Sequence, residues 1–283
     1  MTGAVMAAAI GTWKTSETEM SRALYRTLVP GDVAMADQLH GSYVDLALIQ
    51  QQGADGMLRK HHARKTDFRT GKKHGIGDHQ VLWSKPQQRP QHMSPAAFDA
   101  LPPTLMVREV SLRLTRPGWR DQCIIVVTTL LDTERYSAQQ LTQLYGYRWQ
   151  AAEVNLRHLK TTLKMEMLAA KTPSMVRKEF WAHLLAYNLL RTIMEQAAPK
   201  ADFQRARLSL QQTRQGFRAI LSELAASEPS QQQRLYDDLL NETATALLPE
   251  RPHRQEPRVV KQRPKPFPRM KQPRSVLKDK LAA

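Results

Sequence analysis

The segment at residues 145–160, YGYRWQAAEVNLRHLK, sets one carboxylate among cations and aromatic rings. An ideal helix turns about 100° per residue, so Glu153 and Lys160, seven positions apart, share a face. Trp149 lies one turn before Glu153, and Arg157 lies one turn after it. A carboxylate can hold a hard cation such as Mg²⁺, and the basic side chains can hold a phosphate backbone. The face therefore suits a site that binds metal and nucleic acid together, although a solvated charged helix would show the same residues.

A second carboxylate closes a predicted strand nearer the N-terminus. Residues 32–37, DVAMAD, are a short apolar run that ends in Asp37. An aspartate at a strand end can be a metal ligand, or it can simply cap the turn that follows. Asp37 and Glu153 are the two carboxylates to consider once other chemistries are excluded.

Most other catalytic motifs are absent from the sequence. It has no G-x-x-x-x-G-K-[ST] loop, no G-x-G-x-x-G after a strand and no G-x-S-x-G turn. No set of Cys and His residues has the spacing of a zinc site. The adjacent His61 and His62 lie in a basic loop. His158 and His183 stand alone, as surface or core residues commonly do. The one cysteine, Cys123, lies in the apolar run CIIVVTTLL and is expected to be a small buried hydrophobe in a reducing compartment.

Charge is the strongest signal in the composition. Forty-two Lys and Arg against 26 Asp and Glu give a net charge of +16, which favours a polyanionic partner, most often nucleic acid. The apolar fraction of 41% is enough for a core. The N-terminus lacks the basic region of a secretory signal, and no apolar run approaches the roughly 20 residues of a membrane span. We expect a cytoplasmic protein with no membrane partner.

The elements that must position these residues begin as an α/β pattern. We expect a strand at residues 3–10, a helix from Thr15 or Ser16 to about Leu28, a buried strand at 32–37, a helix at 43–52 and a strand at 55–60. Strands that alternate with helices favour an α/β sheet.

The remainder of the chain changes character. Residues 61–120 are basic and punctuated by proline, and their alternating segments VLWSKP and LMVREVSLRLT predict a β-rich insertion. After a buried strand at 122–131, Ser137 and Gln140 resemble a capping box. Helices are expected from Ser137 onward and at about 174–197, 203–224 and 229–247. The last 33 positions hold 11 Lys and Arg, two acids and six prolines, which predicts a disordered basic tail.

These shifts predict five regions. They are a partial core at 1–60, the β-rich insertion at 61–120, the rest of the core with the Glu153 helix at 121–197, a helical region at 198–250 and the tail at 251–283.

Residues 145–160 resemble the Tyr-x2-Arg-x3-Glu-x6-Lys motif of the insertion-sequence-four family of bacterial DDE transposases. Tyr145, Arg148, Glu153 and Lys160 fill its positions. Residues 30–43, PGDVAMADQLHGSY, resemble the family's second block, in which an aspartate ends a strand. Residues 172–191 resemble the helix that follows the motif. Two separated blocks in the right order make the resemblance far more specific than either block alone.

The resemblance implies an RNase H-like catalytic core in which two Asp and one Glu hold two Mg²⁺ ions. Asp37 would be the second Asp of this set and Glu153 the final Glu, both catalytic and both metal ligands. Tyr145, Arg148 and Lys160 would contact double-stranded transposon-end DNA, with Arg157 on the same basic face. Trp149 would pack behind them or stack on a base. The family also implies cut-and-paste DNA transposition, work as a homodimer on paired ends, and no small-molecule cofactor.

The chain departs from the family's pattern in two places. Four residues separate Arg148 from Glu153 where the motif has three, which predicts a π-bulge near residues 149–152. The first Asp of the family's set has no counterpart here, because residues 3–10 resemble the third strand of the fold. We therefore expect a truncated copy with an incomplete core that lacks its first strands and does not cleave DNA. The alternatives are a non-catalytic DNA-binding remnant that interferes with intact transposase, and a degraded product that folds poorly.

Overall fold

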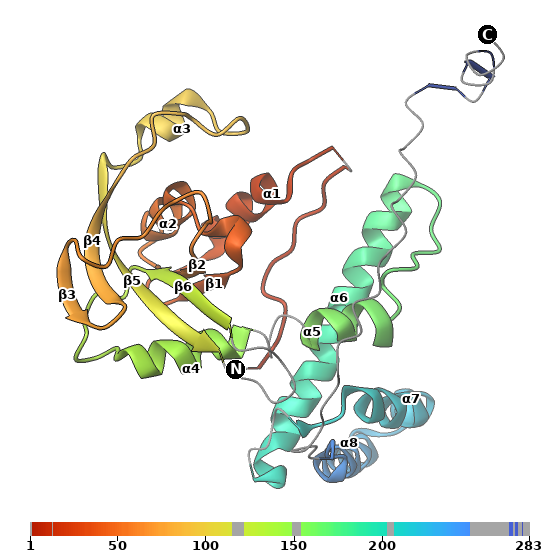
Figure 1. Cartoon of the computed structure of the whole chain (residues 1–283). Helices are drawn as coiled ribbons and strands as arrows, with labels where there is room; N and C mark the ends of the chain where they lie inside the picture. Colours follow the sequence, from red (N-terminus) through yellow and green to blue (C-terminus); the bar gives the residue numbers. More distant parts are fainter. Residues whose placement is uncertain are drawn as a thin grey trace.

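A computed structural model gives the fold of the protein (Figure 1). It describes residues 2–12, 14–114, 122–148, 154–202 and 207–249, together with residues 272, 273, 275, 276 and 279. The strands are β1 (Val33–Ala36), β2 (Asp55–Arg59), β3 (Lys72–Gly75), β4 (Asp78–Ser84), β5 (Thr104–Leu114) and β6 (Gln122–Thr128). The helices are α1 (Glu17–Leu24), α2 (Tyr43–Gln50), α3 (Pro95–Asp99), α4 (Ala138–Arg148), α5 (Asn155–Arg157), α6 (Pro173–Ala197), α7 (Leu210–Ala226) and α8 (Pro229–Thr245). Short 3-10 turns are η1 (Tyr25–Thr27), η2 (Gln38–His40) and η5 (Ala198–Ala201), and η4 (His158–Thr162) is π-helical.

One sheet organises the first half of the molecule. Its six strands run in the order β1-β2-β6-β5-β4-β3. β1 pairs parallel with β2, and the other neighbouring pairs are antiparallel. The strands predicted for the β-rich insertion therefore continue the same sheet as β2 and β6. Figure 1 shows α2 and α4 on opposite sides of this sheet. The mixed α/β architecture that the sequence predicts is confirmed, and the five region boundaries stay a prediction.

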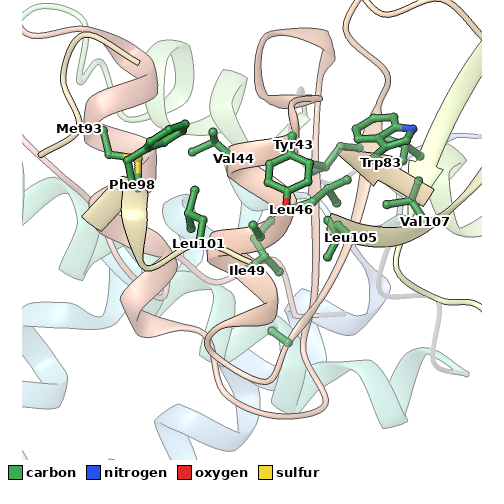
Figure 2. Close-up of a cluster of buried hydrophobic side chains, with 14 residues drawn as sticks. Tyr43, Val44, Leu46, Ile49, Trp83, Met93, Phe98, Leu101, Leu105 and Val107 are labelled. Carbon is green, nitrogen blue, oxygen red and sulfur yellow. The ribbon is translucent and has the colours of Figure 1, made fainter. Parts of the chain in front are cut away.

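Apolar clusters pack on both faces of the sheet, because successive side chains of a strand point to opposite faces. On one face, apolar side chains of α2 pack against Trp83 of β4 and Leu105 of β5 (Figure 2). On the other face, Val110 and Leu112 of β5 pack against Leu141 of α4. Adjacent residues of β2 also point to opposite faces. Leu58 belongs to the cluster on the α2 side and Met57 to the cluster on the α4 side.

The start of α4 is fixed to the sheet by a buried cation. Arg108 of β5 is 1% exposed and donates from Nε to Asp78 of β4 at 2.8 Å. The same guanidinium donates from Nη1 to the Tyr136 carbonyl at 2.6 Å. The next residue begins the predicted capping box, which is confirmed: Ser137 N–H donates to Gln140 Oε1 at 2.8 Å, and Gln140 N–H donates to Ser137 Oγ at 3.2 Å.

Helices α6, α7 and α8 form a third apolar cluster, and the N-terminal segment lies against it. The prediction of a strand at residues 3–10 is wrong, because these residues form no strand. Asn188 of α6 supplies the hydrogen bonds that a neighbouring strand would have made: Val5 N–H donates to its Oδ1 and its Nδ2 donates to the Val5 carbonyl, both at 2.8 Å. Tyr187 adds a bond from its hydroxyl to the Gly3 carbonyl at 2.9 Å. An extended backbone needs its polar groups satisfied, and here side chains of a helix do so.

Some of the other predictions are confirmed, and others are wrong. Ser16 caps α1 by accepting from Glu19 N–H at 3.1 Å, as one of the two predicted caps. β1 forms where expected, but its four residues are only half-buried because it is an edge strand. Cys123 is exposed rather than buried, since it alternates with the inward-facing Ile124 on β6. The predicted helix at 203–224 begins only at Leu210, and residues 203–206 and most of the predicted tail lie outside the described residues.

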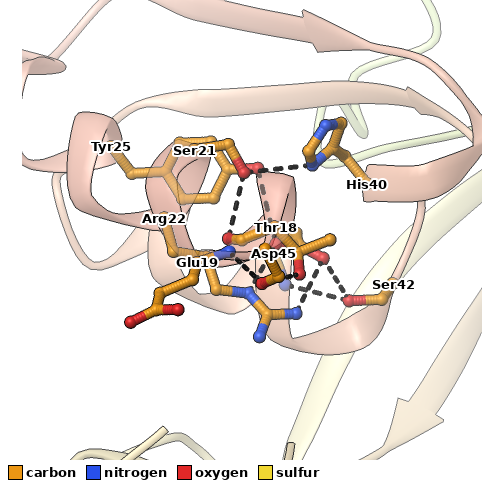
Figure 3. A network of polar contacts seen from close by, with 9 residues as sticks. Thr18, Glu19, Ser21, Arg22, Tyr25, His40, Ser42 and Asp45 are labelled. Carbon is orange, nitrogen blue, oxygen red and sulfur yellow. Dashed lines mark hydrogen bonds and ion pairs between the residues drawn. The ribbon is translucent and has the colours of Figure 1, made fainter. Parts of the chain in front are cut away.

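A buried carboxylate on α2 ties the first two helices together (Figure 3). Asp45 is 0% exposed and accepts from Arg22 Nε of α1 at 2.9 Å and from Arg22 Nη2 at 3.3 Å. It also accepts from the hydroxyls of Tyr25 and Ser42. Burial raises the pKa of Tyr25, and the adjacent Asp45 charge raises it further. The carboxylate thus has partners from α1, from η1 and from the residue that caps α2.

We predict that Asp45→Asn strongly lowers the stability of the chain. The substitution leaves the Arg22 guanidinium, whose side chain is 18% exposed, beside a neutral amide. Breaking a buried ion pair by removing one partner costs about 3–5 kcal/mol. The measurement is the unfolding free energy from urea titration, followed by circular dichroism.

The control is Asp67→Asn. Asp67 also pairs with an arginine, Arg69 Nε, at 2.9 Å, but those two side chains are 45% and 88% exposed. Exposed pairs contribute little, so this variant should unfold at the wild-type urea concentration. Equal stability of the Asp45→Asn variant and the wild type would contradict the assigned role of Asp45.

Candidate functional site

The candidate site lies where β1 and β2 end. The two strands are parallel and pair Ala36 with Leu58, so Asp37 and Arg59, which follow those residues, lie at one edge of the sheet. The Asp37 side chain is exposed, and its Oδ1 accepts from Leu39 N–H at 2.9 Å. Asp37 therefore caps η2, as the simpler of the two predicted roles has it, with its carboxylate on the surface.

The turn after Asp37 crosses the end of β2 at close range. A Cβ on Gly41 would lie 1.9 Å from the Arg59 carbonyl oxygen. His61 N–H donates to the Gly41 carbonyl at 3.0 Å, which fastens the turn to the chain beyond β2. A residue other than glycine at 41 would force the turn away from the strand end, and the position of Asp37 would change with it.

Tyr145 supports the same strand end from the α4 side of the sheet. Its ring is 1% exposed, and its hydroxyl donates to the Ala36 carbonyl at 3.3 Å. Burial raises the pKa of Tyr145, while Arg148 and then Arg59 lower it. The Arg148 guanidinium lies 5.2 Å from the centre of the Tyr145 ring. One carboxylate, one phenol and two guanidinium groups thus gather at the end of β1.

Two of the predicted site residues, Glu153 and Trp149, lie outside the described residues, as does the π-bulge expected at 149–152. The meeting of Glu153 with Asp37 therefore stays a prediction. π-Helical geometry does occur a little further on, at η4. Within the described parts of the chain, no group of three His, Cys, Asp or Glu side chains could hold a metal ion.

The remaining predicted cations point outward from the helices after the site. Arg157 at the end of α5 and Lys160 in η4 are exposed, whereas Leu159 between them is 5% exposed and packs into the α6–α8 cluster. His158 is half-buried beside them. Burial lowers the pKa of His158, and Arg191 and Arg157 lower it further. The segment thus buries an apolar residue and presents basic groups to solvent.

Arg59 was not predicted as a site residue. The sequence shows it only as the end of the strand segment DGMLR. Its place beside Asp37 follows from the parallel register of β1 and β2. Two consecutive parallel strands end at the same sheet edge, so pairing those two predicted strands would have indicated this arginine. The predicted contact of Tyr145 with DNA stays a prediction, and in the structure that side chain lies in the core.

Comparison with known proteins identifies the family to which the chain belongs. A family model described as a transposase DDE domain matches residues 1–189. The transposase InsG for insertion sequence element IS4 of Escherichia coli (strain K12) is 28% identical over 272 residues, which are 93% of this chain and 58% of that protein. The putative transposase InsL for insertion sequence element IS186A of the same organism is 34% identical over 79 residues, or 28% of this chain and 20% of that protein.

The chain thus spans just over half the length of the IS4 transposase. No helix in the described part of the chain is long and apolar enough to cross a membrane. The family model covers more than half of the chain. The chain therefore belongs to the DDE transposase family, and to the insertion-sequence-four type that its residues 145–160 resemble.

Proposed function

We propose that the chain is a transposase component that binds double-stranded transposon-end DNA and presents a phosphodiester to the end of β1. The observation that carries the proposal is the exposed Asp37 carboxylate, which lies at a strand end beside Arg59 and Arg148 in a member of the DDE family. The intact reaction would be metal-dependent hydrolysis of a phosphodiester followed by strand transfer.

The basic side chains would provide most of the binding energy. A protein that neutralises phosphates releases counterions, so its affinity falls steeply with salt. The net charge of +16 supplies a favourable field. Arg157 and Lys160 are exposed on one short helical segment, and we assign them to the DNA backbone. Arg148 would act closer to the scissile phosphate, where Tyr145 fixes its surroundings.

Asp37 and Glu153 are the proposed ligands of a divalent cation, Mg²⁺. Carboxylate oxygens suit such a cation, and the Asp37 carboxylate is exposed at the strand end. In this reaction class a bound metal activates the attacking oxygen and stabilises the leaving one. Of these two proposed ligands, Asp37 lies among the described residues. The protein's own side chains are therefore assigned to holding the cation and the DNA.

A non-catalytic DNA-binding protein is the second candidate. The cations at residues 148, 157 and 160 could bind a DNA backbone whether or not a metal ion is held nearby. Such a chain would bind transposon ends and compete with intact transposase. Preference for one terminal inverted repeat over random duplex would favour descent from a transposase. A homodimer is a further proposal, which sedimentation of the DNA complex would test.

The first prediction concerns the basic segment. We expect Arg157→Glu combined with Lys160→Glu to weaken binding to a 20-base-pair duplex by about 10-fold or more. Two lost phosphate contacts should also reduce the slope of log K against log salt by about 2. Fluorescence anisotropy over a range of salt concentrations measures both quantities.

The matched control is Arg218→Glu combined with Arg234→Glu. Both side chains are exposed, on α7 and α8, and the charge change is the same. If DNA binding depends on the α5–η4 segment, the control should keep most of its affinity and nearly all of its salt slope. Equal losses in the two double variants would show that only net charge matters and would refute the assigned interface.

The second prediction separates the two candidate functions. If the chain is a non-catalytic DNA-binding protein, we expect it to bind a transposon-end duplex but neither nick nor join it in Mg²⁺ or Mn²⁺. Denaturing gels of end-labelled duplex provide the measurement. Robust cleavage that Glu153→Gln abolishes would overturn this expectation and establish the chain as an active nuclease.

A further inference from the structure

A basic cavity lies beside the turn that follows Asp37. It has a volume of about 510 Å³ and is lined by α1, the first turn of α2, the loop after β2 and the segment after β4. Its lining includes Arg22, Arg64 and His61, and no acidic residue. A second cavity of about 460 Å³, between α7 and α8, is lined without any charged side chain. The basic lining therefore distinguishes the first cavity from the second.

Arg22 reaches the cavity with its orientation already fixed. Asp45 accepts from its Nε and Nη2, as Figure 3 shows. Its Nη1 makes no hydrogen bond to any residue that the structure describes. One face of the guanidinium is thus anchored to the fold while a donor remains for a ligand.

Arg64, which also lines the cavity, is held in place as well. Its guanidinium carbon lies 4.1 Å from the centre of the Trp83 ring, and its Nη2 donates to the Ser84 carbonyl at 3.5 Å. Lys60 Nζ donates to its backbone carbonyl. Neither Nε nor Nη1 of Arg64 has a hydrogen-bond partner among the described residues. Burial lowers the pKa of Arg64, and Glu109 partly offsets that effect.

Two carboxylates lie behind these arginines and do not neutralise the cavity. Asp45 is engaged by Arg22, and Glu109 already receives Trp83 Nε1 at 2.9 Å and lies 3.3 Å from His79 Nε2. Lys60 adds a third cation in the same region, at 8% exposure. Arg22 and Arg64 line the cavity and neither carboxylate does, so the charged side chains of its lining are basic.

The first turn of α2 adds backbone donors to the same wall. Ser42 caps the helix by accepting from Asp45 N–H, and Tyr43 and Val44 line the cavity. The N–H groups of Tyr43 and Val44 make no hydrogen bond to a described residue. Such groups at the start of a helix favour an anion.

We propose that this cavity binds one phosphodiester group of the DNA strand that passes over Asp37. The inference rests on the proposed function and adds a second, separate contact to it. The volume is within the range of about 300–1,000 Å³ that is typical of sites for small ligands, so a phosphate and its sugar would fit. Gly41, which lines the cavity, follows Asp37 by four positions, so a single strand could engage both.

The test changes the charge of the cavity without removing a residue that holds the fold. Ala63 lines the cavity and is exposed. Ala63→Glu should weaken binding of a 20-base-pair duplex by about 10-fold, whereas Ala63→Lys should bind at least as tightly as the wild type. The control is Ala96→Glu, at an exposed alanine of α3 away from the cavity lining. Thermal melts check that all three variants fold.

The outcomes distinguish this proposal from the proposed function. Equal weakening by Ala63→Glu and Ala63→Lys would indicate a steric effect and would overturn a phosphate site. Wild-type affinity in Ala63→Glu, together with weak binding by the Arg157→Glu, Lys160→Glu variant, would overturn the cavity site and leave the proposed function standing. A wild-type chain that does not bind the duplex at all would overturn both.

Discussion

The bond between Asp45 and Arg22 is the interaction on which the site most depends. A carboxylate with no solvent exposure is stable only when it is paired and hydrogen-bonded, and Asp45 has partners from α1, η1 and the α2 cap. The cap residue, Ser42, is five positions after Asp37. The buried pair therefore fixes the residue at which the turn after β1 ends, while the Asp37 carboxylate itself accepts from Leu39 N–H within that turn.

The position of Asp37 also depends on the sheet. Among the strands that the structure describes, β1 pairs with β2 alone, so its carboxyl end would be poorly fixed by strand pairing alone. Tyr145 compensates from the α4 side by bonding to the Ala36 carbonyl, and Gly41 allows the following turn to lie against the end of β2. α4 is in turn held by Arg108, through the carbonyl of the residue before its capping box. Asp37 thus rests on contacts from both faces of the sheet.

Local signals in the sequence predicted local structure well. The caps at Ser16 and Ser137, the strand at 55–60 and the alternating strands β4 and β5 follow from side-chain chemistry within a few residues. The segment at 3–10 was predicted wrongly because small apolar residues suit any extended backbone, and its hydrogen-bond partners, Tyr187 and Asn188, lie far along the chain. The site residues also divide into those that the local sequence predicts and those that depend on distant contacts. Asp37 could be placed at a strand end, but Arg59 and the burial of Tyr145 depend on strand register and on packing between elements far apart in the chain.

The arrangement of cations gives a physical reason to treat the two sides of the Asp37 turn as one surface. Arg59 and Arg148 gather at the strand end, and Arg22, Lys60 and Arg64 gather around the cavity. Holding partly buried cations near one another costs free energy through desolvation and repulsion. Asp45 and Glu109 offset part of that cost from the interior, but neither carboxylate faces the cavity lining. A polyanion that spans the turn would offset the rest at both places at once, which is a physical reason for cations to lie on both sides of the exposed Asp37 carboxylate.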